Sequence, residues 1–138
     1  MVNVERIAHG RDVLAVIIPS GFSSEGIQFF TPKDYSQQLG FIRHTAGKRV
    51  QEHTHKPQDR IITYTQEVLF VRRGRVKVNL FDKKKRFVAE RVLSNGDIIL
   101  LVSGGHVFEF LEDTELIEVK QGPYLEKDDK ERFDGVYE

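Results

Sequence analysis

The sequence predicts an all-β fold, an antiparallel barrel or jelly roll made by one domain. Short β-prone segments alternate with turn residues along most of the chain, and no amphipathic helix of ten or more residues stands out. The length of 138 residues fits one domain, and no linker separates two apolar regions. A domain of this size buries roughly two thirds of its unfolded surface, which is enough for a real core.

The individual strands follow from apolar runs and the turns between them. We expect strands over 14–18, 26–30, 38–44 and 50–55, and a long β-prone run over 61–72 that ends at Gly74. Val76, Val78 and Leu80 alternate with polar residues, which is typical of a half-buried strand. Further strands are expected over 87–93, 98–102, 106–111 and 115–120, separated by turns at 82–86, 94–97 and 103–105.

Charge and cysteine content exclude several classes of function. The chain has 21 basic and 21 acidic residues, so its formal net charge of zero gives no reason to expect nucleic acid or an anionic membrane as a partner. The basic run at 83–86 lacks interleaved aromatic residues and indicates a solvated hairpin tip. No cysteine is present, which excludes disulfides and thiolate metal sites. Without a signal peptide or an apolar run of membrane-spanning length, we expect a cytoplasmic protein.

Four residues suggest a metal site. His53 and His55 are two apart, so on a strand their imidazoles would project from one face and could bind one metal ion. Glu67 begins a strongly apolar strand, where an inward carboxylate needs a partner such as a metal. His106 follows Gly104 and Gly105, a turn that can re-aim the next side chain.

Each of these residues also has a simpler interpretation. The two histidines of His53-Thr54-His55 could be exposed at a strand end, and Glu67 could face outward or pair with an arginine. If all four residues bind one ion, they fill four positions of an octahedron and leave two open, which is typical of a catalytic rather than a structural site. The expected cofactor is a divalent ion, with zinc, iron, manganese and nickel left open.

The spacing of these residues resembles the two motifs of the cupin superfamily. Gly47, His53, His55, Glu67 and Gly74 follow the order of the first motif, and the second opens at 96–97 and ends at His106. The resemblance implies a double-stranded β-helix barrel over about 38–120 within a single domain of 1–138, with an N-terminal strand arm and a polar C-terminal tail. It also implies the four-residue metal site and a homodimer. The sequence departs from the pattern in a longer spacing between His55 and Glu67, and in a second motif without proline.

The extra residues, 56–66, are expected to extend a hairpin beside the barrel mouth, as a plain extension or as a wall of the ligand site. Arg60 and Tyr64 are the candidate catalytic residues, because they offer a charge and a hydroxyl group there. Gln38, Arg43, Gln66 and Lys120 are further candidates for the mouth, each with a solvated surface role as the alternative. His44 has the opposite strand parity to Arg43 and is expected to face outward if Arg43 faces inward.

These features favour a metal-dependent protein that acts on a small polar organic molecule, such as a sugar-like compound, by isomerase, epimerase or oxygenase chemistry. Two alternatives remain open. The chain could bind a small molecule without turnover, since few proton-transfer residues are evident beyond the ligands themselves. It could also be a metal-free cupin that resembles certain sugar epimerases, with histidines acting as acid and base. Whether the chain is an enzyme is therefore left open by the sequence.

Overall fold

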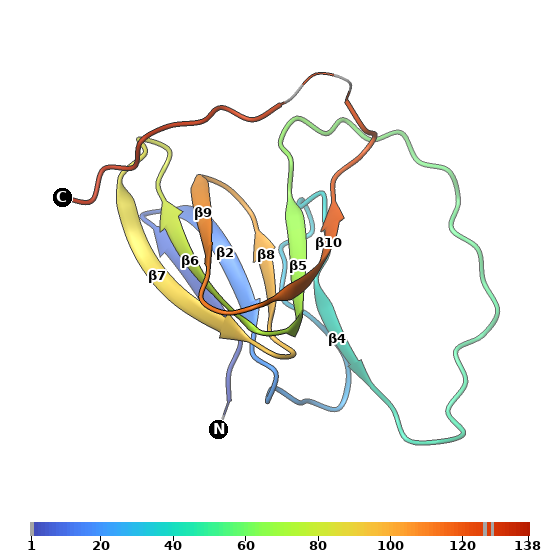
Figure 1. The fold of residues 1–138 in the computed structure, drawn as a ribbon. Coiled ribbons are helices and arrows are strands. Elements are labelled where there is room, and N and C mark those ends of the chain that lie inside the picture. Colours follow the sequence, from blue (N-terminus) through green and yellow to red (C-terminus); the bar gives the residue numbers. More distant parts are fainter. Residues whose placement is uncertain (1, 126, 128) are drawn as a thin grey trace.

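The computed structural model describes residues 2–125, 127 and 129–138, and its regular elements are all β-strands (Figure 1). The all-β prediction is thereby confirmed. The strands are β1 (Glu5–His9), β2 (Asp12–Ile18), β3 (Gly26–Phe29), β4 (Gly40–Arg43), β5 (Glu67–Arg73), β6 (Arg75–Phe81), β7 (Phe87–Ser94), β8 (Ile98–Leu101), β9 (Gly105–Phe110) and β10 (Glu115–Lys120). Across the described residues, no helix is long and apolar enough to cross a membrane.

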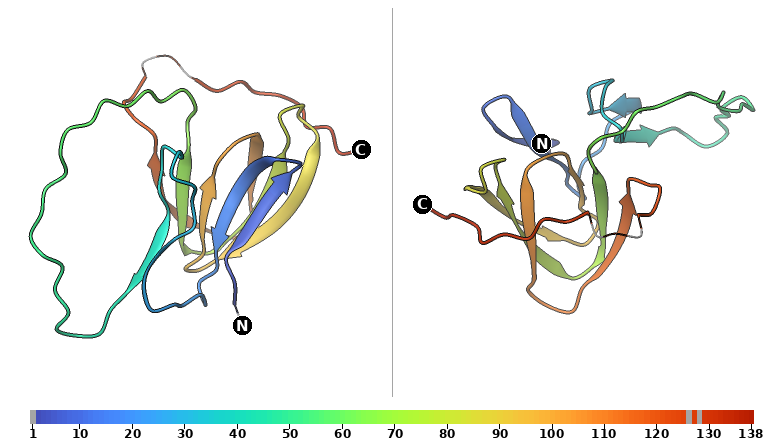
Figure 2. Two further views of the ribbon diagram at one scale, coloured as in Figure 1. Left: turned by 180° about the vertical axis from the view of Figure 1, so that it is seen from behind. Right: turned by 90° about the horizontal axis from the view of Figure 1, so that it is seen from above.

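Every pair of neighbouring strands is antiparallel. A five-stranded sheet has the order β1-β2-β8-β5-β10, and a three-stranded sheet has the order β7-β6-β9. The remaining pair, β3 and β4, forms a separate hairpin. Figure 2 shows the hairpin beside the larger sheet and the arrangement of the two main sheets.

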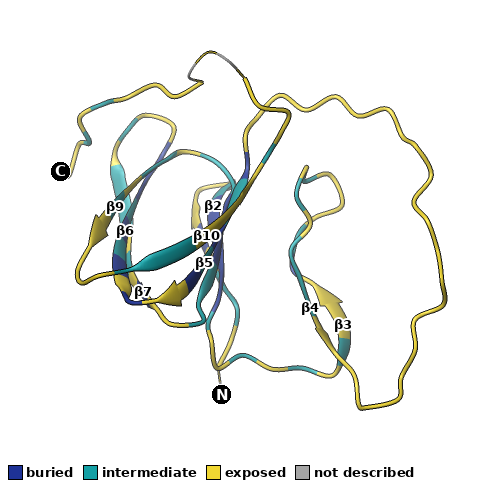
Figure 3. Cartoon of the chain, turned by 45° about the vertical axis from the view of Figure 1, so that its right-hand side comes forward, coloured by how far each residue is buried: buried dark blue, intermediate teal, exposed yellow. Residues whose placement is uncertain are grey.

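The main core lies between the five-stranded and the three-stranded sheet. Leu69 and Val71 of β5 pack in one cluster with Ile99 of β8 and with Val78 and Leu80 of β6. Because successive side chains of a strand alternate between its faces, these residues define the inner face of each sheet. Figure 3 shows this interior as the buried part of the chain. The β2 strand lies before the expected barrel core of 38–120, yet it supplies Leu14, Ala15 and Ile17 to this cluster.

A second apolar cluster covers the outer face of the five-stranded sheet. Val16 and Leu100, whose neighbours in sequence face the main core, pack here with Phe30 and Phe41 from the hairpin region. Phe22 contacts both phenyl rings edge-to-face, with ring centroids 5.4 Å from Phe30 and 5.2 Å from Phe41. The domain is thus a two-sheet sandwich with the β3–β4 hairpin packed on one outer face.

Two glycine turns fix how the strands succeed one another. Gly74, between β5 and β6, has a φ of 105°, and a Cβ there would lie 2.5 Å from the carbonyl oxygen of Asp113. Gly104, just before β9, has a φ of 74°, and a Cβ would lie 2.2 Å from the carbonyl oxygen of Phe81. Only glycine accepts both the positive φ and the close approach. The hairpin tip expected at 82–86 is confirmed, because it joins β6 to β7.

The largest difference from the sequence prediction is the segment 44–65, which we call the arm. The strand expected over 50–55 is wrong, and so is the first part, 61–66, of the one expected over 61–72: the arm contains no strand, and β5 begins only at Glu67. All of its residues are exposed, and it loops away from the sandwich (Figure 1). Val50 is the only apolar residue between Lys48 and His55, so a strand there has little apolar surface to bury against a sheet.

The C-terminal tail, residues 129–138, crosses from the β10 side of the sandwich to β7 (Figure 1). It is anchored at its far end, where Val136 exchanges backbone hydrogen bonds with Phe87 and Lys85 at 2.6 and 2.9 Å. Phe133 packs edge-to-face on Phe81, and the Tyr137 ring stacks on Phe87 with centroids 5.4 Å apart. The polar tail inferred from the sequence is therefore held by aromatic contacts.

The inner core gives a first prediction. Replacing the fully buried Ile99 by alanine removes apolar contacts between the sheets, and we expect the free energy of unfolding to fall by about 2–5 kcal/mol. The matched control is Ile61→Ala in the arm, where the side chain is 99% exposed and the change should stay within about 0.5 kcal/mol. Urea unfolding measures both. Equal losses in the two variants would contradict the placement of the core and the arm.

Candidate functional site

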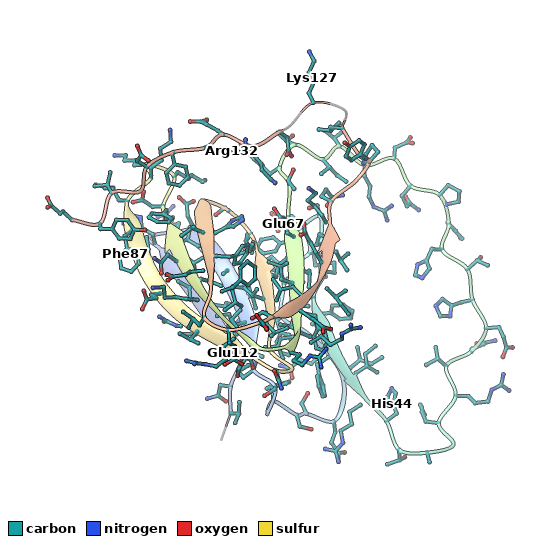
Figure 4. The ribbon with its side chains drawn as sticks, in the orientation of Figure 1. His44, Glu67, Phe87, Glu112, Lys127 and Arg132 are labelled. Carbon is teal, nitrogen blue, oxygen red and sulfur yellow. The ribbon has the colours of Figure 1, made fainter. Side chains whose placement is uncertain are left out.

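The inner face of the sandwich changes from apolar to charged at one end, which we call the mouth. Glu67, the first residue of β5, has the same parity as Leu69 and Val71 and lies opposite Leu101 of β8. All three of those residues belong to the main core, so Glu67 also faces the space between the sheets. Figure 4 shows Glu67 on the inner side of β5, beneath the tail.

The neighbouring strand adds two more charged groups to this face. In the β5–β10 ladder, Glu118 lies opposite Leu69 and Lys120 lies opposite Glu67. Directly opposed residues share a face of the sheet, so both side chains point into the mouth beside Glu67. Glu118 is close enough to hydrogen-bond to the Glu67 carboxyl group. Two ionised carboxylates cannot form such a bond, so this contact favours the protonated form of Glu67.

Burial raises the pKa of the Glu67 carboxyl, and the nearby Glu118 raises it further through its charge and hydrogen bond. The ammonium groups of Lys120 and Lys130 act in the opposite direction on the same pKa. Two carboxyl groups that share a site cannot both ionise readily, which is the physical basis of an acid and a base held side by side. The mouth therefore holds a carboxyl group, Glu67, whose neutral form is favoured, with a second carboxyl group beside it.

His106 reaches the mouth from the other sheet. It pairs with Leu80 of β6, a core residue, and so faces inward, where its ring lies 5.2 Å from that of Phe108. Burial lowers the pKa of the His106 imidazole, with Lys130 acting in the same direction and Glu118 opposing both. The shift favours the neutral imidazole, which can accept or donate a proton.

The tail helps to enclose this site. Lys130 influences the pKa of both Glu67 and His106, so its charge lies near both sheets at the mouth. The Asp129 carboxylate accepts a hydrogen bond of 2.9 Å from the Thr65 hydroxyl, which ties the tail to the end of the arm. At the other side, the Lys85 ammonium pairs with Glu131 at 2.6 Å. The tail thus runs near the mouth between two fixed points, the end of the arm and the turn between β6 and β7.

A cavity of about 430 Å³ lies where β5 begins and β10 ends. The chain that precedes β5 forms one wall of the cavity, and the chain that follows β10 forms the other. Its lining residues include Tyr64, Thr65, Lys120, Gln121, Tyr124 and Lys130. Lys120 and Lys130 belong to both the cavity and the surroundings of Glu67, so the two regions adjoin.

The four expected metal ligands are divided between two places. Glu67 and His106 lie at the mouth, whereas His53 and His55 lie in the exposed arm with ring centroids 5.3 Å apart. The Nδ1 atom of His53 lies 2.8 Å from the carbonyl oxygen of Gln51. Within the described part of the chain, no group of three or more histidine, aspartate or glutamate residues is arranged to hold a metal ion. As placed, these donors do not fit one ion, and the four-residue site stays a prediction.

The two candidate catalytic residues also separate. Arg60 is exposed in the arm, while Tyr64 lines the cavity beside the mouth with 79% of its surface exposed. Of the other candidates, Lys120 reaches both the mouth and the cavity.

The remaining candidates hold the scaffold together. The Gln66 side-chain oxygen is buried and accepts hydrogen bonds from the Gln37 backbone and the Ser36 hydroxyl at 3.0 and 3.3 Å. The Gln38 amide donates to two carbonyl oxygens of the turn before it. Arg43 donates to the Ser23 hydroxyl at 3.3 Å, and His44 next to it is exposed. Their positions indicate structural contacts outside the mouth.

Sequence reasoning missed Glu118 and Lys130. A signal for Glu118 was present, since it has the parity of Leu116, an apolar residue of the same strand that packs on the core. The pairing of β10 with β5 then decides that Glu118 meets Glu67. Lys130 gave no such signal, because it lies outside the strands, where hydrophobic periodicity does not indicate which side chains face inward.

Comparisons with known proteins add no relative. A scan against protein-family models found no match, and neither the search of curated proteins nor the search of solved structures found a similar chain. Inferences about function therefore rest on the residues and geometry of this chain.

The carboxyl pair predicts a pH-dependent effect on stability. The pKa of Glu67 is raised by folding, so its favourable contribution is complete below the unfolded-state pKa and is lost as pH rises through the folded-state pKa. We expect Glu67→Gln, which mimics the neutral acid, to gain stability relative to the natural protein as pH increases from about 4 to 7. Urea unfolding at several pH values measures the difference. His106 is present in both proteins, so most of its own contribution to the pH dependence of stability cancels in the comparison.

The control for this experiment is Glu25→Gln, the same chemical change at an exposed carboxyl group before β3. It should show no comparable trend with pH. A difference between Glu67→Gln and the natural protein that stays constant from pH 4 to 7 would contradict the raised pKa.

Proposed function

We propose that the chain is a small single-domain cupin that binds a small polar organic molecule at its mouth and moves a proton on it, as a metal-independent isomerase or epimerase does. The observation that carries this proposal is that Glu67, Glu118 and His106 all lie opposite core residues and so face the same inner space. The first two side chains come from the five-stranded sheet and the third from the three-stranded sheet.

The cupin part of the proposal is supported by where the motif residues lie. Gly74 and Gly96 occupy tight turns with positive φ, at 105° and 88°, between consecutive strands. Glu67 opens β5, His106 follows the first residue of β9, and both face the interior between the two sheets. These motif residues therefore lie at the starts of strands or in the turns between strands, around the space between the two main sheets.

The chemistry follows from the two sides of the mouth. A carboxylate of the pair can remove a proton from a carbon next to a carbonyl group, and the developing oxyanion needs a cation nearby, which Lys120 can supply. A proton returned to the same face restores the substrate. If the His106 imidazole first takes a proton from solvent and then gives it to the opposite face of the carbon, the product is the epimer, and the carboxyl group returns its proton to solvent. If the carboxyl group returns its proton to the neighbouring carbon, while the hydroxyl proton moves between the two oxygens of the enediol, the product is the isomer.

The test is exchange of substrate hydrogen with solvent. We expect the natural protein to incorporate deuterium from D2O into members of a panel of aldoses and hydroxyketones, followed by NMR. Glu67→Gln should slow the exchange by about 100-fold or more, because a positioned base contributes that much to proton transfer. His106→Gln should lose inversion more than exchange.

The controls are Glu25→Gln and His44→Gln, which make the same changes at exposed positions. They should retain the natural rate. Exchange that is absent in the natural protein across the panel, together with a compound recovered unchanged from the purified protein, would instead establish a binding protein without turnover.

A metal-dependent function is the second candidate, favoured by the neutral imidazole of His106 and by the adjacent rings of His53 and His55. It requires the arm to bring those two histidines to the mouth. The arm has no strand pairing and is exposed throughout.

We also propose a homodimer, because β10 is an edge strand whose apolar residues Ile117 and Val119 are exposed.

This second function makes its own prediction. Adding Zn²⁺ should bind the arm to the mouth and protect the peptide bonds after Lys48, Arg49 and Arg60 from trypsin. His53→Ala and His55→Ala should each lower zinc affinity at least tenfold, about 1.4 kcal/mol, as measured by calorimetry. His44→Ala, at the first residue of the arm, is the control. Unchanged affinity in both variants, or no protection of the arm, would exclude this site.

A further inference from the structure

The outer edge of β10 presents backbone groups away from its own sheet. β10 is the last strand of the five-stranded sheet, and no other strand of the described chain pairs with its outer edge (Figure 2). The Gln121 N–H donates to the carbonyl oxygen of Gln66 at 3.0 Å, so the backbone groups of Gln121 and Val119 point toward β5. The backbone groups of Glu118 and Lys120, one residue out of step, therefore point outward.

The other three outer strands of the two main sheets are less suited to pairing with another chain. β1 contains a bulge, which interrupts its regular edge. The start of β7 is joined by the tail, because the Phe87 N–H donates to the carbonyl oxygen of Val136 at 2.6 Å. At the start of β9, Phe133 of the tail lies so close to Gly105 that a Cβ there would be 2.5 Å from its ring. β10, by contrast, keeps a regular register with β5 over 116–120.

The outer face of β10 is apolar and lies outside both core clusters. Ile117 and Val119 point to this face and are 47% and 57% exposed. Val119 lies opposite Val68 of β5, which packs against the second apolar cluster beneath the β3–β4 hairpin. The apolar surface of the sheet therefore continues past the hairpin onto β10. A regular edge strand with exposed apolar side chains favours pairing with a strand of another chain.

The inner face of β10 indicates that this other chain is a second copy. Glu118 and Lys120 are two residues apart, carry opposite charges and both point into the mouth. If two copies pair antiparallel about a two-fold axis at Val119, Glu118 of each copy lies opposite Lys120 of the other. An axis at Glu118 or at Lys120 places two like charges opposite each other, and an axis at Ile117 places Glu118 opposite Leu116. Opposite charges that face each other across two strands stabilise the pairing, and like charges weaken it.

We propose that two copies of the chain pair through β10, antiparallel about a two-fold axis at Val119, so that the partner's Lys120 enters the mouth opposite Glu118. This inference rests on the proposed function, because it states how the homodimer forms and what the second copy adds to the site. The pairing satisfies the outward backbone groups of Glu118 and Lys120, since these residues become hydrogen-bonded pairs across the axis. It also brings the two Val119 side chains together on the outer face and removes them from water.

Charge reversal tests this register, with analytical ultracentrifugation in low salt as the measurement. Glu118→Lys turns every Glu118–Lys120 pair of the dimer into two ammonium groups, and Lys120→Glu turns it into two carboxylates. We expect the natural protein to sediment as a dimer and each variant to associate at least tenfold more weakly, because both charge pairs become repulsive. Mixing the two variants in equal amounts should restore the dimer, because each pair then joins opposite charges again.

A further variant tests the outer face. Val119→Lys places two ammonium groups beside each other at the axis and should weaken association as the charge reversals do. The matched control is Val107→Lys, the same change on the outer face of the edge strand β9, where the side chain is 46% exposed. This control should remain a dimer. Urea unfolding of each variant checks that the sandwich is intact, and a dimer restored by mixing excludes misfolding as the cause of the monomers.

The remaining outcomes overturn the inference. They are a natural protein that stays monomeric up to its solubility limit, natural association in either charge reversal or in Val119→Lys, a mixture that stays monomeric, or a dimer that Val107→Lys dissociates. Sedimentation does not depend on turnover, so this inference and the proposed function fail separately. A dimer with this pairing that exchanges no substrate hydrogen would overturn the proton-transfer function alone. Exchange by a natural protein that is monomeric would overturn the pairing alone.

Discussion

The change from apolar to acidic side chains along the inner face of β5 is the constraint on which the site depends. Leu69 and Val71 hold the two sheets together, and Glu67, next on the same face, cannot join them as a bare charge at low cost. The main core therefore has to end there. Where it ends, the sheets still face one another, so the last inward residues of neighbouring strands meet in a space that is neither core nor open surface.

The carboxyl pair is the consequence of that position. In water, Glu67 and Glu118 would both ionise and repel each other, while deep in the core neither could carry a charge. Partial burial favours the neutral form of Glu67, and Lys120 opposite Glu67 limits how far the pKa of that carboxyl group rises. A charge that is neither fully solvated nor fully suppressed is what a proton-transfer group needs near neutral pH. His106 meets the same compromise from the other sheet, with burial lowering its pKa.

Strands in which apolar and polar residues alternate were predictable from the sequence, because the alternation itself indicates which face is buried. The run from Val76 to Leu80 was identified on this basis, and the positive-φ turn at Gly74 matches the turn expected after β5. The arm was not predictable in this way, since its β-prone residues, such as Ile61, have no sheet to pack on and remain exposed. Of the site, Glu67 and His106 could be found from their place in apolar strands. Glu118 depended on which strand pairs with β5, a long-range fact that periodicity does not contain.

The position of the arm distinguishes the two proposed functions, because proton transfer and metal binding would both use Glu67 and His106. A metal ion would need both groups free of protons, whereas burial and the nearby Glu118 raise the pKa of Glu67 and favour its protonated form. The hydrogen bond between the carboxyl groups and a metal at Glu67 are thus competing states of one site. With the arm extended, His53 and His55 cannot offset the loss of that bond, and the carboxyl pair is favoured. Arm closure would have to supply two imidazoles and displace any proton on Glu67 in the same step, which would make metal binding at this mouth both pH-dependent and coupled to folding of the arm.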